Sequence, residues 1–352
     1  MGAHPKLHAV LHSPLNKMLR SPPVSIIIPL YNKAHTLARA LRSVLRQTYQ
    51  DFEIVVVDDG STDDSVSVLR GFSDARIRLL QQSNAGPGAA RNRGVRESCG
   101  RFVGFLDADD ELCPDFLERS LGNLKAHPQC AVSVCKAFSE PQKSVSHAGP
   151  MSPPEKGEWR LPVSMAPKSL NATIRSVHVT ALWRKEPFLE LGGFYENHCT
   201  LGEDTYLWLL VSLNCAIYFD AQPLFYYHTE SSALNWWRRL NPVERNSASA
   251  IRQRPLPPYL TDPVRLRHNC PEHYRPLLEG FLALEALSEA LTRVSVGDAI
   301  TARWLRDQFP LMRSLRADYT KLRLKLLVPW AAPCVRKLRT RLTARQRADR
   351  PM

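Results

Sequence analysis

The chain has 352 residues, of which 44% are hydrophobic and 23% are charged, which is the composition of an ordinary soluble globular protein. Its net charge of +13 suggests nucleic-acid binding until the charge is located, because residues 301–352 hold 14 Lys/Arg against 3 Asp/Glu. The body of the chain is therefore nearly neutral, which argues against a basic nucleic-acid-binding domain, and we expect no nucleic-acid partner. A membrane-spanning helix is not expected either, since no apolar run approaches the length of roughly 18 residues that one needs.

The cysteines and the first residues bear on the compartment. Eight cysteines are scattered without a C-x-x-C pair, which favours reduced, mostly buried thiols over a disulfide framework. Residues 1–23 hold four prolines and three histidines and lack the continuous apolar core of a secretory signal. We therefore expect a flexible N-terminal segment over 1–23 and a cytoplasmic location.

From residue 24 the chain alternates between short apolar runs and amphipathic segments. The first run, VSIIIPLY at residues 24–31, is continuously apolar, as expected of a strand buried on both faces. Further strands are predicted at 52–59, 76–82, 101–107 and 131–138, and helices at 33–48, 62–72, 86–98 and 113–127. The alternation predicts an α/β fold with a mixed, mainly parallel sheet flanked by helices and with ligands at the carboxyl ends of the strands.

The alternation stops after residue 140. Residues 140–170 are rich in Pro, Ser, Lys and Gly and are predicted to form a long loop. Beyond it we expect helices at 187–194 and 201–213 and strands at 216–220 and 223–228. From Ser231 the pattern is helical with proline interruptions.

Three carboxylates, Asp107, Asp109 and Asp110, follow the apolar run RFVGFL within four positions. Like charges this close repel one another, and partly buried carboxylates stay ionised only when a cation offsets them. The D-x-D spacing of Asp107 and Asp109 suits a divalent cation such as Mg²⁺ or Mn²⁺ that bridges to phosphate oxygens. A solvated turn is the alternative, and Asp110 is predicted to start the following helix.

Four blocks in register resemble the family 2 glycosyltransferases, enzymes of the GT-A fold that transfer a sugar from a nucleotide donor. They are VSIIIPLYNKAHTLARALRSVLRQTYQDFEIVVVDDGSTDDS, NAGPGAARNRGV, GRFVGFLDADDEL and GEDTYLWL. The resemblance covers about residues 24–230 and implies one domain with a nucleotide-binding half at 24–135 and an acceptor half at 171–230. Residues 231–352 would then form a helical C-terminal region with a basic amphipathic tail from about residue 301.

The resemblance also implies a nucleotide-sugar site. Its residues are Pro29, Tyr31, Asp58, Asp59, Asn84, Gly86, Arg91 and Asp107. Asp59 would contact the base, while Asp58 has helix capping as its alternative. The glycine turn at Gly86 would allow close backbone approach, and Arg91 would face phosphate, with a surface arginine as the alternative.

The same resemblance implies metal ligands and a base. Asp109 would bind the metal directly, with Asp107 on the metal or ribose side, and His228 would lie near the metal or the diphosphate. Relatives often carry an arginine where this chain has Tyr226, which weakens the inference for His228. In the GED motif, Asp204 is the expected general base and Glu203 the close alternative.

The implied activity is that of an inverting, metal-dependent transferase of the hexosyltransferase type. It would move a single sugar from a nucleoside-diphosphate sugar, by family habit a UDP-sugar, to a glycan or lipid-linked acceptor in cell-surface polysaccharide or lipopolysaccharide synthesis. The motif NWWRRL (235–240) is not the Q-x-x-R-W of processive relatives, which favours a single transfer. The alternatives are an inactive nucleotide-sugar-binding protein of the same fold and a nucleotidyltransferase, which usually has a basic glycine-rich loop where this chain has PLYNKAHT.

The basic tail has two apolar stripes at helical spacing. They consist of Met312, Leu315, Tyr319, Leu322 and Leu326 and, further on, Val335, Leu338 and Leu342. A basic amphipathic helix suits an anionic membrane surface, here the inner face of the membrane, to which the protein would be peripheral. The alternative is a helix packed on the enzyme body with a solvated basic face.

Overall fold

The computed structural model describes residues 22–140, 144–145, 156–175, 179–197, 199, 202–229 and 247–327. Most of the predicted N-terminal segment, the NWWRRL motif and the second stripe of the tail lie outside these residues.

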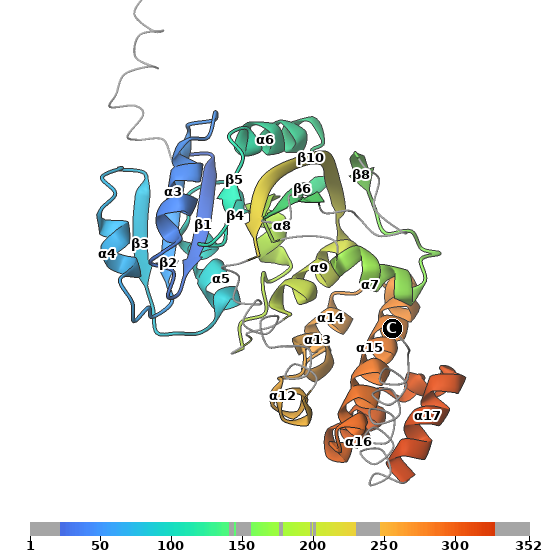
Figure 1. The fold of residues 1–352 in the computed structure, drawn as a ribbon. Helices are drawn as coiled ribbons and strands as arrows, with labels where there is room; N and C mark the ends of the chain where they lie inside the picture. Colours follow the sequence, from blue (N-terminus) through green and yellow to red (C-terminus); the bar gives the residue numbers. More distant parts are fainter. Residues whose placement is uncertain are drawn as a thin grey trace, which may run out of the picture.

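A mixed sheet forms the centre of the molecule, with the strand order β3-β2-β1-β4-β9-β6-β10-β5 (Figure 1). The strands are β1 (Val24–Leu30), β2 (Phe52–Asp58), β3 (Ile77–Gln81), β4 (Phe102–Phe105), β5 (Glu111–Leu112), β6 (Cys130–Glu140), β7 (Ser144–Val145), β8 (Gly157–Trp159), β9 (Ala181–Arg184) and β10 (Ala216–His228). Parallel pairs join β3, β2, β1 and β4, and another joins β6 to β10, whereas β9 is antiparallel to both of its neighbours. The predicted mixed, mainly parallel sheet is confirmed.

Helices cover both faces of this sheet. They are α3 (Leu37–Leu45), α4 (Ser65–Arg70), α5 (Pro87–Glu97), α6 (Phe116–Ala126), α7 (Pro167–Arg175), α8 (Lys185–Glu190) and α9 (Glu203–Asn214). The apolar faces of α3 and α6 pack into one hydrophobic core, and those of α5, α8 and α9 pack into the other. Strand β1 divides its side chains between the two, since Ile26 and Ile28 enter the first core and Ile27 the second. Both faces are buried, which explains the unbroken apolar run in the sequence.

Three local predictions differ from the structure. The two strands predicted at 216–220 and 223–228 are one strand, β10, which continues through an irregular register between Asp220 and Phe225. The stretch predicted as a loop at 140–170 includes β7, β8 and the first turn of α7. Asp110 does not start a helix, because α6 begins at Phe116 with Asp115 as its N-cap residue.

The described part of the C-terminal region, residues 247–327, is helical, as predicted, and lies beneath α7 and α9 in Figure 1. It comprises α12 (Ala248–Gln253), α13 (Pro258–Thr261), α14 (Val264–His268), the short 3₁₀ helix η1 (Glu272–Tyr274), α15 (Arg275–Ser295), α16 (Ala299–Gln308), the 3₁₀ helix η2 (Pro310–Ser314) and α17 (Arg316–Leu327). The long helix α15 is its centre and contacts α7, α16 and α17. Helix α7 also contacts α9, so the region is continuous with the core beside the sheet.

The first apolar stripe of the basic tail lies against this bundle. Met312 and Leu322 are fully buried and Leu326 is nearly so, while the neighbouring Leu324 and Leu327 are exposed. The alternative of a helix packed on the protein body is therefore the one observed for residues 312–327. None of the helices in the described residues is both long enough and apolar enough to cross a membrane.

Candidate active site

The carboxyl ends of β1, β2 and β4 meet at one edge of the sheet, and the loops that follow them are tied together. Asn32, two residues after the end of β1, has a positive φ of 51°, and its Oδ1 accepts a hydrogen bond of 2.8 Å from the backbone N–H of Thr62. The N–H of Asn32 in turn donates to Ser61 Oγ at 3.1 Å. These bonds fix the loop after β1 against the loop after β2, so the side chains at this edge project from a held backbone.

The predicted base-binding residues lie here. Pro29 is partly buried within β1, and the Tyr31 side chain is 48% exposed at its end, where a ring is available for stacking. Asp58 and Asp59 are buried at the end of β2. Asp58 Oδ1 accepts from the N–H of Ser61 at 3.0 Å, so it closes the turn after β2 rather than capping helix α4.

Asp59 builds the loop that precedes α5. Its carboxylate accepts from the N–H groups of Ala85 and Gly86 at 2.8 and 2.9 Å and from the side chain of Gln82 at 2.8 Å. Three donors already hold the carboxylate, so it fixes the backbone of the loop that precedes α5. Its predicted contact with a base stays a prediction.

The glycine turn that starts α5 approaches the chain itself. Gly86 has a φ of 91°, and a Cβ at this position would lie 2.9 Å from the carbonyl oxygen of Cys199. A Cβ on Gly88 would lie 2.5 Å from the carbonyl oxygen of Tyr195. The small residues therefore let α5 pack against the segment that leads into α9. Asn84, two residues before Gly86, is exposed.

Arg91 is buried between two groups of carboxylates, contrary to the alternative of a surface arginine. Its Nη2 donates to Asp107 Oδ1 at 2.6 Å and its Nη1 donates to Glu203 Oε1 at 3.1 Å. Burial lowers the pKa of Arg91, but the charges of Asp107 and Glu203 outweigh it and raise the pKa above its ordinary value. The guanidinium is thus a fixed positive charge that joins the loop after β4 to the start of α9.

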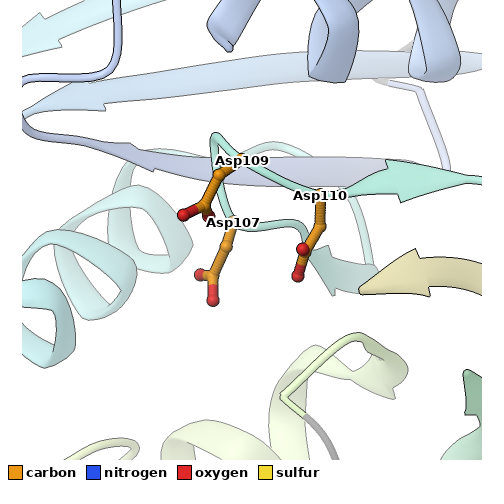
Figure 2. A group of neighbouring side chains, drawn as sticks. All are labelled: Asp107, Asp109 and Asp110. Carbon is orange, nitrogen blue, oxygen red and sulfur yellow. The ribbon is translucent and has the colours of Figure 1, made fainter. Parts of the chain in front are cut away.

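Asp107, Asp109 and Asp110 form one cluster, which we call the three-aspartate group. Their carboxylate oxygens lie within 4.8 Å of one another, and Figure 2 shows the three side chains projecting to the same side of the loop after β4. Asp107 is partly exposed, whereas Asp109 and Asp110 are buried. Burial raises the pKa of Asp109 and of Asp110, and the nearby aspartates raise both further. Clustered, desolvated carboxylates are the donor set that a hard divalent cation prefers, so the residues fit Mg²⁺ or Mn²⁺.

Two cationic side chains that the sequence did not single out contact this group. Lys33 Nζ lies 2.5 Å from Asp109 Oδ2, and this contact lowers the pKa of Asp109 against the effect of burial. Arg39 Nη2 donates to the backbone carbonyl of Asp109 at 2.5 Å. The sequence feature that could have identified these two residues is their position, since Lys33 comes three residues after β1 and Arg39 lies in the first turn of α3.

His228 supports the three-aspartate group from β10. Its backbone N–H donates to Asp110 Oδ1 at 3.0 Å, and its Nε2 lies 2.8 Å from Glu111 Oε1. The cluster of potential metal ligands found in the described residues contains the three aspartates but not His228. A direct bond between His228 and a metal stays a prediction, while its backbone contact with the group is observed.

The second pair of carboxylates begins α9. Gly202, with a φ of 87°, is the N-cap residue, and Glu203 and Asp204 occupy the first turn. Glu203 is buried, and burial followed by the charge of Asp204 raises its pKa although Arg91 opposes the shift. Asp204 is partly exposed, and its Oδ1 accepts from the N–H of Thr205 at 2.6 Å. The two neighbours therefore differ: Glu203 is held by Arg91, and Asp204 lies outside that ion pair.

Comparison with known proteins identifies the family of one segment of the chain. Residues 25–189 match the family model "Glycosyl transferase family 2". This segment belongs to the family 2 glycosyltransferases. The expected GT-A fold is likewise confirmed, since TarS from S. aureus aligns with 85% of this chain and 91% of its own chain at a TM-score of 0.53 and 18% identity.

Curated relatives match part of this chain and a smaller part of their own length. An uncharacterized glycosyltransferase of Rickettsia bellii is 30% identical over 211 residues, which are 58% of this chain and 28% of the relative. YibD of Escherichia coli, also an uncharacterized glycosyltransferase, is 39% identical over 116 residues, 32% of this chain and 33% of the relative. WfgD of Escherichia coli, a UDP-Glc:alpha-D-GlcNAc-diphosphoundecaprenol beta-1,3-glucosyltransferase, is 43% identical over 99 residues, 28% of this chain and 39% of the relative. The chain thus spans less than half the length of each of these relatives.

Proposed function

We propose that the chain is an inverting glycosyltransferase that moves a single sugar from a nucleoside-diphosphate sugar to a glycan or lipid-linked acceptor. The observation that carries the proposal is the arrangement of two carboxylate groups around Arg91. The three-aspartate group suits the metal-bound diphosphate of a donor, and the pair at the start of α9 supplies a base on the other side of Arg91. A solvated turn would not bury Asp109 and Asp110 in such a cluster.

The donor side is assigned to the loops after β1, β2 and β4. Tyr31 and the turn around Asp58 and Asp59 would hold the nucleoside, with Asn84 and Gly86 at the neighbouring turn, and Asp107 and Asp109 would hold Mn²⁺ or Mg²⁺. When bound, such a cation neutralises charge that develops on the diphosphate as the sugar–phosphate bond breaks. We favour a UDP-sugar, because TarS has been solved with UDP and with UDP-GlcNAc and WfgD is named for UDP-Glc.

Asp204 is proposed as the general base. In an inverting transfer the acceptor oxygen attacks the anomeric carbon while the nucleoside diphosphate leaves from the opposite face, and a carboxylate takes the proton of the acceptor hydroxyl. Glu203 is less suited, because its buried carboxylate is already bonded to Arg91. Glu203 instead keeps Arg91 in place, so that the guanidinium faces Asp107.

The acceptor and the location are proposed by analogy with WfgD, whose name includes a diphosphoundecaprenol substrate. A lipid-linked acceptor would place the reaction at the inner face of the membrane, in the synthesis of a cell-surface polysaccharide or lipopolysaccharide. The basic C-terminal region would then lie near anionic lipid, with the exposed basic side of α17 rather than its buried stripe toward the lipid.

Hydrolysis of a panel of nucleotide sugars by the purified protein, with and without Mn²⁺, tests this function. We expect slow, metal-dependent release of a nucleoside diphosphate from one donor, and loss of this release in Asp109→Ala. Binding of a nucleotide without turnover of any donor, even with lipid-linked acceptors added, would favour an inactive binding protein of the same fold. Release of pyrophosphate from a nucleoside triphosphate would instead identify a nucleotidyltransferase.

A further inference from the structure

Lys33 is placed against the proposed metal ligand Asp109 although the two residues are 76 positions apart in the sequence. Its Nζ lies 2.5 Å from Asp109 Oδ2, and the two side chains are only 17% and 10% exposed. We propose that Lys33 competes with the divalent cation for Asp109 and moves to the donor diphosphate once that cation is bound. This inference rests on the proposed function and adds a diphosphate-binding residue to it.

The backbone of Lys33 is held in place. Its N–H donates to Ser65 Oγ at 2.8 Å, and the N–H of Ala34 donates to Asp63 Oδ2 at 3.1 Å. On its other side, Asn32 is bonded to the loop after β2. Since the backbone is anchored on both sides, the exchange requires only a change of rotamer in the long side chain of Lys33. Its ammonium therefore stays close to the three-aspartate group.

A lysine ammonium and a divalent cation would compete strongly for Asp109 Oδ2. A Mg²⁺ ion binds carboxylate oxygens at roughly 2.1 Å, so a metal and the ammonium that shared Asp109 Oδ2 would be separated by at most about 4.6 Å. Charges of +2 and +1 at this separation repel one another, most of all in a site where water is partly excluded. Binding of the metal to Asp109 therefore favours release of Lys33.

The released ammonium has a new partner nearby. Lys33 follows Tyr31, which is proposed to contact the nucleoside, by two residues in the loop after β1, and its ammonium contacts Asp109 of the three-aspartate group. A donor that spans these two places brings its diphosphate past Lys33, and phosphate oxygens are favoured partners of an ammonium. The lysine would thus exchange a carboxylate for a phosphate as donor and metal enter together, while Arg91 stays fixed between Asp107 and Glu203.

Calorimetric titrations with two probes, Mn²⁺ alone and UDP in saturating Mn²⁺, test the exchange. Lys33→Met removes the charge and keeps much of the length, Lys33→Arg keeps the charge, and Lys168→Met removes an exposed lysine on α7 as the matched control. For Lys33→Met we expect Mn²⁺ to bind roughly 3- to 10-fold more tightly than to the parent, since a competing charge is gone. We expect UDP to bind roughly 10-fold or more weakly, since a charge-assisted contact is lost. Lys33→Arg and Lys168→Met should resemble the parent with Mn²⁺.

Two outcomes would overturn the inference. Equal or weaker Mn²⁺ binding by Lys33→Met would show that the lysine does not compete for Asp109. Tighter Mn²⁺ binding with unchanged UDP affinity would show that it does not pass to the diphosphate. If Lys33→Met does not fold, as judged by circular dichroism, Lys33→Gln takes its place in both titrations. A parent protein that binds neither Mn²⁺ nor UDP would instead overturn the proposed function itself.

Discussion

The site has two clusters of carboxylate side chains, the three-aspartate group and the Glu203–Asp204 pair, and their surroundings differ. The three-aspartate group gathers three carboxylates after β4, two of them buried, and draws Lys33 and Arg91 against them. The pair at the start of α9 places only Glu203 in the interior, bonded to Arg91, and leaves Asp204 partly exposed in the first helical turn. The first group is a crowded anionic site that needs a cation, whereas the second leaves one carboxylate available for a proton. The difference is consistent with the proposed division between holding the donor and activating the acceptor.

The largest effect is expected at Asp109. Asp109→Asn removes the charge at the centre of the three-aspartate group, so the release of nucleoside diphosphate from the donor in Mn²⁺ should fall by about 10²–10⁴-fold. Asp115→Asn, at the N-cap position of α6, is the matched control and should retain the activity of the parent. Activity of Asp109→Asn within threefold of the parent would remove the metal-binding role from this group.

An effect of similar size, which separates the roles of two neighbouring residues, is expected at the start of α9. Asp204→Asn should lower the rate of sugar transfer to an acceptor by roughly 10²–10⁴-fold, because the base is lost, while the affinity for UDP in Mn²⁺ stays that of the parent. Glu203→Gln keeps an acceptor for Arg91 and should lose about tenfold or less. If Glu203→Gln were the more damaged variant in transfer assays, the two assignments would have to be exchanged.

Arg91 links the groups, and its loss should reduce stability. Arg91→Met leaves the buried Glu203 without its partner, so the free energy of unfolding in urea should fall by about 3–5 kcal/mol. Adding Glu203→Gln to Arg91→Met should recover part of this loss, because the uncompensated charge is gone, and the four proteins form a double-mutant cycle. Strict additivity in that cycle would show that the two side chains are not coupled.

The smallest effect concerns the crowding within the three-aspartate group. Burial, followed by the charges of Asp107 and Asp109, raises the pKa of Asp110 well above its usual value. A carboxyl that holds its proton more tightly in the folded chain than in the unfolded chain makes stability fall as the pH rises from the unfolded-state pKa through the folded-state pKa. Asp110→Asn avoids this loss and keeps an acceptor for the N–H of His228.

In EDTA near neutral pH, Asp110→Asn should therefore melt above the parent. Each kcal/mol of relief corresponds to roughly 2–4 °C in a domain of 150–250 residues. The difference should close as the pH is lowered towards the usual aspartate pKa. Equal melting temperatures at every pH would mean that the cluster carries no electrostatic strain.

Much of this site could be predicted from the sequence because it depends on local patterns. Buried parallel strands give continuous apolar runs, and the carboxylates that follow β2 and β4 mark the carboxyl ends where ligands bind. Asp109 was singled out in this way, whereas the Glu203–Asp204 pair was singled out by the resemblance of the GED motif to family 2 glycosyltransferases. The roles of their partners were not, because Arg91 meets Glu203 across 112 positions and Lys33 meets Asp109 across 76. Nothing in the spacing of those residues encodes such pairs.

Other predictions failed where two local signals competed. Two strands were predicted at 216–220 and 223–228, but β10 runs through Pro223 in an irregular register against β6. Asp110 resembled a helix start, but Pro114 and Asp115 lie closer to the first turn of α6, and Asp110 is held by His228 instead. The stripe of Met312, Leu322 and Leu326 was equally suited to lipid and to protein, and only the position of α15 decides between them.

Binding of Mn²⁺ in the presence of UDP tests the division between the two carboxylate groups most directly. The signal of free Mn²⁺ can be followed by electron paramagnetic resonance while the parent, Asp109→Asn and Asp204→Asn are titrated in turn. We predict that Asp204→Asn binds Mn²⁺ as the parent does and that Asp109→Asn binds it far more weakly. Equal binding by the parent and Asp109→Asn, or loss of binding in Asp204→Asn, would contradict the assignment of donor metal to one group and proton transfer to the other.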